Sequence, residues 1–190
     1  MDISYFLTRS DYLAGVGLSG RPSVDRPEFK AVVKEVEERT HWFLNNKGTR
    51  SARSYHKELG KIVWEKCGMT RDKAGLEGAI RDLQALRDDF WKNIKVVGAG
   101  NQLAPELERA GRVADFLDFG IMMCLDALTR EESCGGHFRT EYQDAGEAKR
   151  NDEAFAHAAV WKFMGEGKLP ERHTEPLTYE EVQFTTRSYK

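Results

Sequence analysis

The feature that most constrains the fold of this chain is a long stripe of apolar residues at helical spacing. The separations between its members alternate between three and four residues over three heptads. The stripe consists of Leu107, Ala110, Ala114, Leu117, Ile121, Cys124 and Leu128. Residues three and four apart share one face of an α-helix, so the stripe predicts one long helix. Pro105, Glu106 and Glu108 are typical of a helix start, and two glycines favour an end near Cys134.

Three shorter apolar stripes with the same spacing precede this helix. They predict helices at about residues 28–45, 51–67 and 72–91, separated by segments that contain glycine. Connections of only a few residues favour antiparallel neighbours. We therefore predict a mainly α fold, an antiparallel bundle of three to four long helices, over residues 28–134.

Both ends of the chain differ in pattern from this bundle. Residues 1–27 contain several glycines and prolines and are expected to form an irregular N-terminal segment. Residues 135–190 are expected to form a C-terminal extension with one short helix, at 152–164, and an irregular, partly extended tail. Within that tail, β-favouring runs stand at 177–179 and 182–186.

Charge and hydropathy exclude several classes of protein. With 29 basic and 31 acidic side chains, the chain lacks the basic excess that binds nucleic acid or anionic membranes. No run approaches the roughly 18 apolar residues of a membrane-spanning helix, and the N-terminus lacks the pattern of a secretory signal. Three widely spaced cysteines argue against a disulfide framework. We therefore expect a cytoplasmic chain without membrane insertion and without a nucleic-acid partner.

Two patterns that suggest a cofactor or a metal have the wrong context. Residues 15–20 fit the G-x-G-x-x-G pattern of dinucleotide-binding folds, but Pro22 and Pro27 follow where a helix should begin. The cysteines and histidines lack the paired spacing of structural zinc sites, and Cys124 lies on the apolar stripe. We expect a loop at residues 15–20, a core position for Cys124, and no catalytic, cofactor-binding or metal-ligating residue.

The segment after the long helix is the densest in polar and charged groups. Its candidate structural or interface residues are Arg130, Ser133, Gly135, Gly136, His137, Arg139 and Tyr142. One interpretation is a turn whose arginines bind carboxylates or helix carbonyls, and the other is an anion site for a dicarboxylate. We favour the turn, with the fork of Arg139 on a carboxylate such as Asp144 or Glu141.

The same segment resembles the signature of a known family. Residues 132–142 read Glu-Ser-Cys-Gly-Gly-His-Phe-Arg-Thr-Glu-Tyr. This resembles the Glu-Ser-Arg-Gly-Ala-His-x-Arg-x-Asp-Tyr signature of the succinate dehydrogenase/fumarate reductase flavoproteins. Cys134, Gly136 and Glu141 replace the arginine, alanine and aspartate of the signature, which is similar to the branch with Ser-Cys-Gly-Gly-His.

Further segments are similar to the C-terminal helical region of that family. Residues 110–128 resemble its long C-terminal helix, and residues 59–68 resemble its Leu-Gly-x-Ile-x-Trp-x-x-x-Gly pattern. The resemblance covers about residues 28–190. It implies the C-terminal helical domain of an enzyme that moves a hydride between succinate or fumarate and FAD and passes electrons to an iron–sulfur subunit.

What the resemblance implies for sites and partners is limited to this region. In the family, the FAD and substrate residues lie in flavin and capping domains N-terminal to it, and no position here matches them. FAD is therefore expected in the implied full-length subunit and not in this chain, which alone would be inactive. The implied partners are the flavin and capping domains and the iron–sulfur subunit, with a cytoplasmic location peripheral to the membrane through partner subunits.

Two alternatives stay open. A free-standing helical adaptor would bind another protein through an exposed apolar stripe. A fragment of L-aspartate oxidase would share the Ser-Arg-Gly-x-His pattern with the family.

Overall fold

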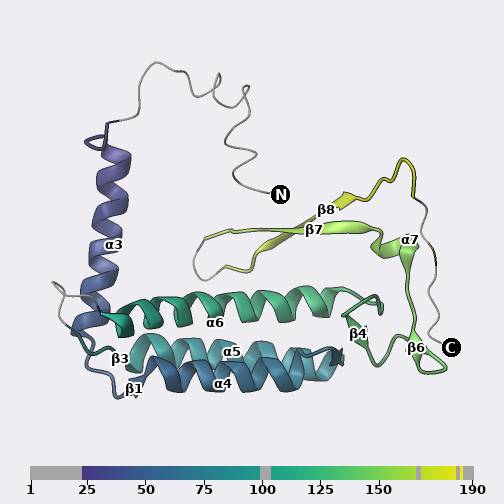
Figure 1. Ribbon diagram of the computed structural model, residues 1–190, viewed down its shortest axis with the longest axis horizontal. Coiled ribbons are helices and arrows are strands. Elements are labelled where there is room, and N and C mark those ends of the chain that lie inside the picture. Colours follow the sequence, from purple (N-terminus) through teal and green to yellow (C-terminus); the bar gives the residue numbers. More distant parts are fainter. Residues whose placement is uncertain (1–22, 99–103, 166–167, 183–184, 186–190) are drawn as a thin grey trace. The chain divides into compact units, whose positions relative to one another are not determined.

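The computed structural model describes residues 23–98, 104–165, 168–182 and 185 (Figure 1). Contacts divide the chain into two units, residues 1–42 and residues 43–190. Most of helix α3 (Pro27–Asn45) belongs to the first unit, and the other described helices and strands belong to the second. The loop expected at residues 15–20 lies outside the described residues. The domain limits expected from the sequence stay a prediction.

Three helices of the second unit form an antiparallel bundle. They are α4 (Ala52–Lys66), α5 (Lys73–Asn93) and α6 (Pro105–Thr129), and α5 runs opposite to the other two (Figure 1). The bounds of α4 and α5 and the start of α6 agree with those that the apolar stripes predicted, whereas α6 ends at Thr129, before the expected end near Cys134. The predicted mainly α fold class is therefore confirmed.

Capping explains where α4 and α5 begin. Ser51 Oγ accepts a hydrogen bond from the amide of Ser54 at 3.3 Å, and Asp72 Oδ1 accepts one from the amide of Gly75 at 2.8 Å. Each bond satisfies an amide that has no partner within the first turn of its helix. Helix α6 has no side-chain cap and begins at Pro105, whose missing amide proton needs no partner.

The core of the bundle consists of the predicted stripes. Its fully buried side chains include Tyr55, Leu76, Leu83, Phe90, Leu117 and Cys124. Cys124 is thus a core residue as expected, and Leu117 of the same stripe is also in the core, whereas Ile121 of that stripe is only half-buried and lines a cavity beside the C-terminal ribbon described below. Gly120 lies where a Cβ atom would come within 3.3 Å of Leu59 Cδ1. Its missing side chain therefore lets α6 approach α4 closely.

Two short parallel ladders close the ends of the bundle. Strand β1 (Arg50–Ser51), which precedes α4, pairs with β3 (Ile94–Lys95), which follows α5. At the other end, β2 (Thr70–Arg71) precedes α5 and pairs with β4 (Phe138–Arg139), which follows α6. The second ladder brings the segment richest in polar groups to the turn between α4 and α5.

The C-terminal extension contains a β-ribbon that the sequence did not predict. The helix predicted at residues 152–164 is wrong: α7 spans only Asp152–Phe155, and the chain continues as strand β7 (His157–Lys162). Strand β7 pairs antiparallel with β8 (Glu171–Pro176). The apolar residues of this segment are β-branched or aromatic in part, so they favour a strand once a partner strand is present. The runs expected to be extended follow β8, and their described residues, 177–179, 182 and 185, carry no strand.

One side chain of the ribbon anchors it to the bundle. Trp161 of β7 donates from Nε1 to Oδ1 of Asp126 on α6 at 2.8 Å. Between α6 and α7, a smaller hairpin pairs β5 (Gln143–Asp144) with β6 (Glu147–Ala148). Its turn contains Gly146 at a φ of +85°, a conformation that glycine adopts without strain.

Candidate functional site

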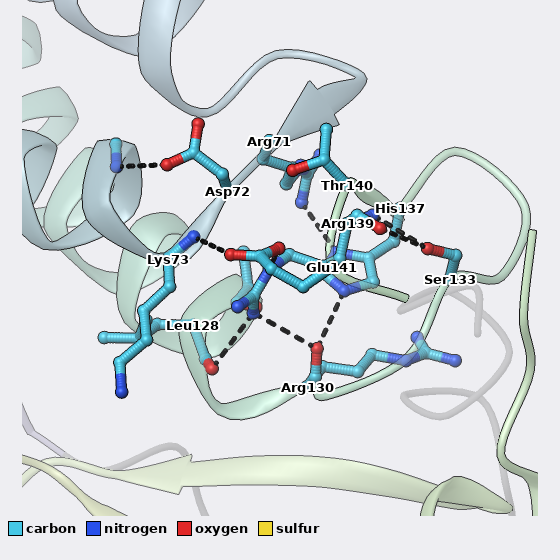
Figure 2. A network of polar contacts seen from close by, with 12 residues as sticks. Arg71, Asp72, Lys73, Leu128, Arg130, Ser133, His137, Arg139, Thr140 and Glu141 are labelled. Carbon is cyan, nitrogen blue, oxygen red and sulfur yellow. Dashed lines mark hydrogen bonds and ion pairs between the residues drawn. The ribbon is translucent and has the colours of Figure 1, made fainter. Parts of the chain in front are cut away.

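The segment after α6 lies against the start of α5. The amide of Phe138 donates to the carbonyl of Met69 at 3.1 Å, and the amide of Thr140 donates to the carbonyl of Arg71 at 2.9 Å. Between these bonds the side chain of Arg139 lies inside the protein, and only 1% of the residue is exposed. Figure 2 shows the polar network around Arg139. We call the segment from Arg130 to Tyr142, which contains most of this network, the Arg139 turn.

Arg139 binds the C-terminal end of α6. Its Nη1 donates to the carbonyl oxygens of Ala127 and Leu128 at 3.1 and 3.3 Å. These carbonyls belong to the last turn of α6, where no helical amide is available and the helix dipole is negative. The guanidinium also lies 5.4 Å from the ring centroid of Tyr142, and its Nε donates to Glu141 Oε2 at 3.2 Å. It therefore divides its donors between helix carbonyls and one carboxylate, whereas the sequence suggested a fork on a carboxylate.

Glu141 extends the network to α5. Its Oε1 accepts a hydrogen bond from the amide of Lys73, the first residue of α5, at 2.5 Å. Burial raises the pKa of Glu141, but the hydrogen bonds from Lys73 and Arg139 outweigh burial and hold the pKa below its ordinary value. A negative charge thus stands at the positive end of α5 and a positive charge at the negative end of α6. One ion pair links the ends of two antiparallel helices.

Ser133 orients the backbone of Arg139. It is fully buried, and its Oγ accepts from the Arg139 amide at 2.8 Å and donates to the Arg139 carbonyl at 3.1 Å. Its own amide donates to the carbonyl of Lys149 at 2.9 Å. On the side of β4 that has no neighbouring strand, the Ser133 hydroxyl binds both the amide and the carbonyl of Arg139. The buried backbone polar groups of Arg139 are therefore satisfied.

A glycine turn separates Ser133 from Arg139. The amide of Cys134 donates to the carbonyl of His137 at 2.8 Å, and the amide of His137 donates to that of Cys134 at 3.1 Å. Gly135 has a φ of +59°, which favours glycine, whereas Gly136 has an ordinary φ and open space around its Cα. Gly135 is therefore the position that the turn requires.

Arg130 and Glu132 join the turn to the C-terminal extension. Glu132 is 2% exposed, and its Oε1 accepts from Nε and Nη2 of Arg130 at 2.8 and 2.7 Å. Its Oε2 accepts from the amide of Asn151 at 2.8 Å, and Asn151 caps α7. Both oxygens of this buried carboxylate thus have donors, as a buried charge requires.

His137 is held as a neutral imidazole between two arginines. Its Nδ1 lies 3.1 Å from Nη1 of Arg71, and its Nε2 lies 3.0 Å from the carbonyl oxygen of Arg130. A guanidinium can only donate, so Nδ1 accepts and Nε2 carries the proton. Burial, opposed by the bond to the Arg130 carbonyl and reinforced by the positive charge of Arg71, lowers the pKa of His137 below its ordinary value.

This arrangement predicts a pH dependence of stability. As the pH falls below about 6.5, the unfolded chain takes up a proton at residue 137 before the folded chain does. The stability that His137 contributes is therefore full above that pH and is lost as the pH falls toward the lower folded pKa. We expect the free energy of unfolding, measured by urea titration at several pH values, to decline on acidification.

The matched control is His137→Gln, whose amide can accept from Arg71 and donate to the carbonyl of Arg130 but does not titrate. The wild-type chain should lose more stability than this variant between pH 7 and pH 5, the range in which histidine normally titrates. Parallel pH curves for the two proteins would contradict the neutral, doubly bonded imidazole.

Three residues that were not among the candidates belong to the same network: Glu132, Glu141 and Arg71. Glu132 and Glu141 lie within the signature segment itself, so their position in the sequence could have identified them as members of the site. Arg71 is distant in sequence, and only the β2–β4 ladder brings it to His137.

Among the described residues, no group of three or more histidine, cysteine or acidic side chains is placed to hold a metal ion. Nε and Nη1 of Arg139 donate to atoms of this chain, which favours the turn over an anion site.

A solved structure shares this architecture. The structure titled "Quinol-Fumarate Reductase with Menaquinol Molecules" superposes with a TM-score of 0.73 at 20% identity, over 87% of this chain and 28% of that one. The fold is therefore that of one region of a fumarate reductase.

Curated relatives agree with this class. The fumarate reductase flavoprotein subunit of Helicobacter pylori is 28% identical over 172 residues, which are 90% of this chain and 23% of that protein. L-aspartate oxidase 2 of Ralstonia nicotianae is also 28% identical, but over 92 residues, 48% of this chain. This chain spans about a quarter of the length of the fumarate reductase relative.

The family itself is shown by a match over most of the chain. The family described as "Fumarate reductase flavoprotein C-term" matches residues 56–189, which include most of the bundle, the Arg139 turn and the ribbon. The chain belongs to this fumarate reductase flavoprotein C-terminal family, and the resemblance of the signature segment is confirmed.

Proposed function

We propose that this chain is the scaffold and subunit interface of a flavoprotein that interconverts succinate and fumarate. In this proposal it packs on the flavin and capping domains of the same subunit and on an iron–sulfur subunit that receives the electrons. FAD is bound by the other domains of the subunit. The family match supports the class of enzyme, and the surface of α4 and α6 supports the interface.

An exposed apolar strip is the observation that carries the interface. Phe116, Phe119 and Met123 follow one another at spacings of three and four on α6, and they are 42%, 63% and 40% exposed. On α4, Trp64 is 84% exposed and lies two turns beyond His56, whose ring contacts that of Phe116. Large exposed apolar groups at helical spacing mark a surface that binds protein. We call these residues the α4–α6 strip.

The described part of the chain gives one observation on location. None of its helices is both long enough and apolar enough to cross a membrane. We include in the proposal a cytoplasmic position, peripheral to the membrane and reached through partner subunits.

Isolation of the tagged chain from its own cells tests the assembly. We expect it to be recovered with bound flavin, visible in the absorption spectrum, and with iron–sulfur protein identified by mass spectrometry. A double Trp64→Ala/Phe119→Ala variant should fold normally but recover less of both, whereas Val160→Ala, exposed on β7, should not change recovery. Recovery without flavin, with some other protein on the strip, would favour the helical adaptor.

The purified chain alone is expected to bind no FAD and to oxidise no succinate. Binding of a dinucleotide pyrophosphate needs a strand, a glycine-rich loop and the start of a helix, and the described residues contain no such unit. Equilibrium dialysis with FAD and reduction of an artificial acceptor with succinate measure the two activities. Flavin retained by the chain, or acceptor reduced with succinate, would show that it carries its own site.

A further inference from the structure

A small cavity beside the Arg139 turn is lined in part by a buried thiol. Its volume is about 200 Å³, it is open to solvent, and its lining includes Cys67, Arg71, Asp126, Arg130 and His137. A cavity of this size admits molecules as small as water. The Arg139 turn uses the arginines and the histidine, but it does not use the sulfur of Cys67.

The thiol of Cys67 is paired with a second cysteine. Cys67 follows α4 as its C-terminal cap and is 4% exposed, and Cys124 lies on α6 with no exposed surface. Both are free thiols, and their side chains are hydrogen-bonded to each other. Cys67 lines the cavity, and Cys124 is not among its lining residues. A small reagent in the cavity therefore meets Cys67 first.

The surroundings shift the pKa values of the two thiols in opposite directions. The hydrogen bond from Cys124 and the positive charge of Arg71 outweigh burial and lower the pKa of Cys67 to about 7. The same hydrogen bond, together with burial, raises the pKa of Cys124. Because the thiolate is the nucleophilic form, Cys67 is the sulfur prepared to attack an electrophile, and Cys124 keeps its proton beside it.

We propose that Cys67 is a hydroperoxide-reactive thiol and that Cys124 converts its oxidised form to a disulfide joining the end of α4 to α6. In the first step, the sulfur of Cys67 attacks the terminal oxygen of a small hydroperoxide, the O–O bond breaks, and Cys67 sulfenic acid and an alcohol or water form. In the second step, the sulfur of Cys124 attacks the sulfenic sulfur. Hydroxide leaves and takes the proton of Cys124 as water, so two thiols have given two electrons to the peroxide.

The burial of Cys67 selects the oxidant. Hydrogen peroxide has two heavy atoms and can reach a thiol that is 4% exposed at the wall of a small cavity, whereas the bulk of glutathione disulfide hinders its contact with so buried a sulfur. Cys134, which is only half-buried and is not among the cavity's lining residues, provides an internal reference for general thiol oxidation.

The experiment treats the folded chain with hydrogen peroxide and maps its cysteines by mass spectrometry under non-reducing conditions. We expect the loss of two of the three free thiols. A single Cys67–Cys124 peptide should appear while Cys134 stays reduced. Glutathione disulfide should leave the pair unoxidised under the same conditions. Cys134→Ser is the matched control and should give the same disulfide as the wild-type chain.

Two variants separate the roles of the sulfurs. In Cys124→Ser, a sulfenic acid on Cys67 should persist and be trapped by dimedone, and in Cys67→Ser, Cys124 should stay reduced. Peroxide that oxidises Cys134 and leaves the pair reduced in the wild-type chain would overturn the proposal. A sulfenic acid that persists on Cys67 of the wild-type chain would overturn the role of Cys124. Both of these outcomes are read on the wild-type protein, so they do not depend on how the variants fold.

Discussion

Replacing Arg139 by alanine is expected to lower the free energy of unfolding by about 3–5 kcal/mol, the range found when one partner of a buried ion pair is removed. The guanidinium is 1% exposed and satisfies the carbonyls of Ala127 and Leu128 together with Glu141. Without it, the carbonyls at the end of α6 lose their donors and Glu141 loses its countercharge. Chemical denaturation followed by far-ultraviolet circular dichroism measures the loss.

Two comparison variants show which property of Arg139 matters. Arg139→Lys keeps the charge but loses the fork, so it should recover only part of the stability. Arg112 is a matched surface arginine, 66% exposed in its side chain and paired with Glu108, and Arg112→Ala should cost less than about 1 kcal/mol. If Arg139→Ala costs as little as Arg112→Ala, the buried network does not stabilise the fold.

The same substitution distinguishes the two interpretations of the turn in the assembled enzyme. If the turn is structural and the proposed function holds, Arg139→Lys lowers stability or subunit assembly, and the proposed enzyme that survives binds succinate or fumarate with unchanged affinity. A change in substrate affinity with stability and assembly intact would restore the anion-site interpretation. Comparing the KM of the assembled variant with its melting temperature provides both readouts.

The parts of this structure that were predictable depend on local order. A helix presents the same face every three or four residues, so an apolar stripe at that spacing marks it. Ser51 and Asp72 mark the starts of α4 and α5, because each caps an amide three residues later. The bounds of α4 and α5 and the start of α6 were therefore available from the sequence, whereas the end of α6 at Thr129 was not. The side chain of Arg139 was also expected to fix a turn, because it follows two glycines that come after the long helix.

The parts that were missed depend on partners distant in sequence. The segment at residues 152–164 has apolar spacing compatible with a helix, and only the pairing of β7 with β8 and the bond from Trp161 to Asp126 make it a strand. In the site, Arg71 reaches His137 only because strands β2 and β4 pair at one end of the bundle. No local pattern reports such contacts, so they could not be predicted from one sequence.

Replacing Leu117 by alanine is expected to cost about 2–5 kcal/mol, because a large buried side chain is lost from a core that relaxes only in part. Leu117 has no exposed surface and lies at the centre of α6. Ile121→Ala should cost less, because this side chain is half-buried beside a cavity, so part of its surface is already in contact with water. Urea denaturation of the three proteins under one set of conditions measures these differences.

Phe119 provides the contrast within the same helix. It stands two positions from Leu117 but is 63% exposed, so Phe119→Ala should change the free energy of unfolding by less than about 0.5 kcal/mol. If the proposed function holds, the order should reverse in the assembled flavoprotein, because the loss of Phe119 from the α4–α6 strip would weaken docking without weakening the fold. If Leu117→Ala lowers the free energy of unfolding by less than about 0.5 kcal/mol, the apolar stripe of α6 faces a partner and not the core. If Phe119→Ala causes a large loss, the α4–α6 strip faces the core.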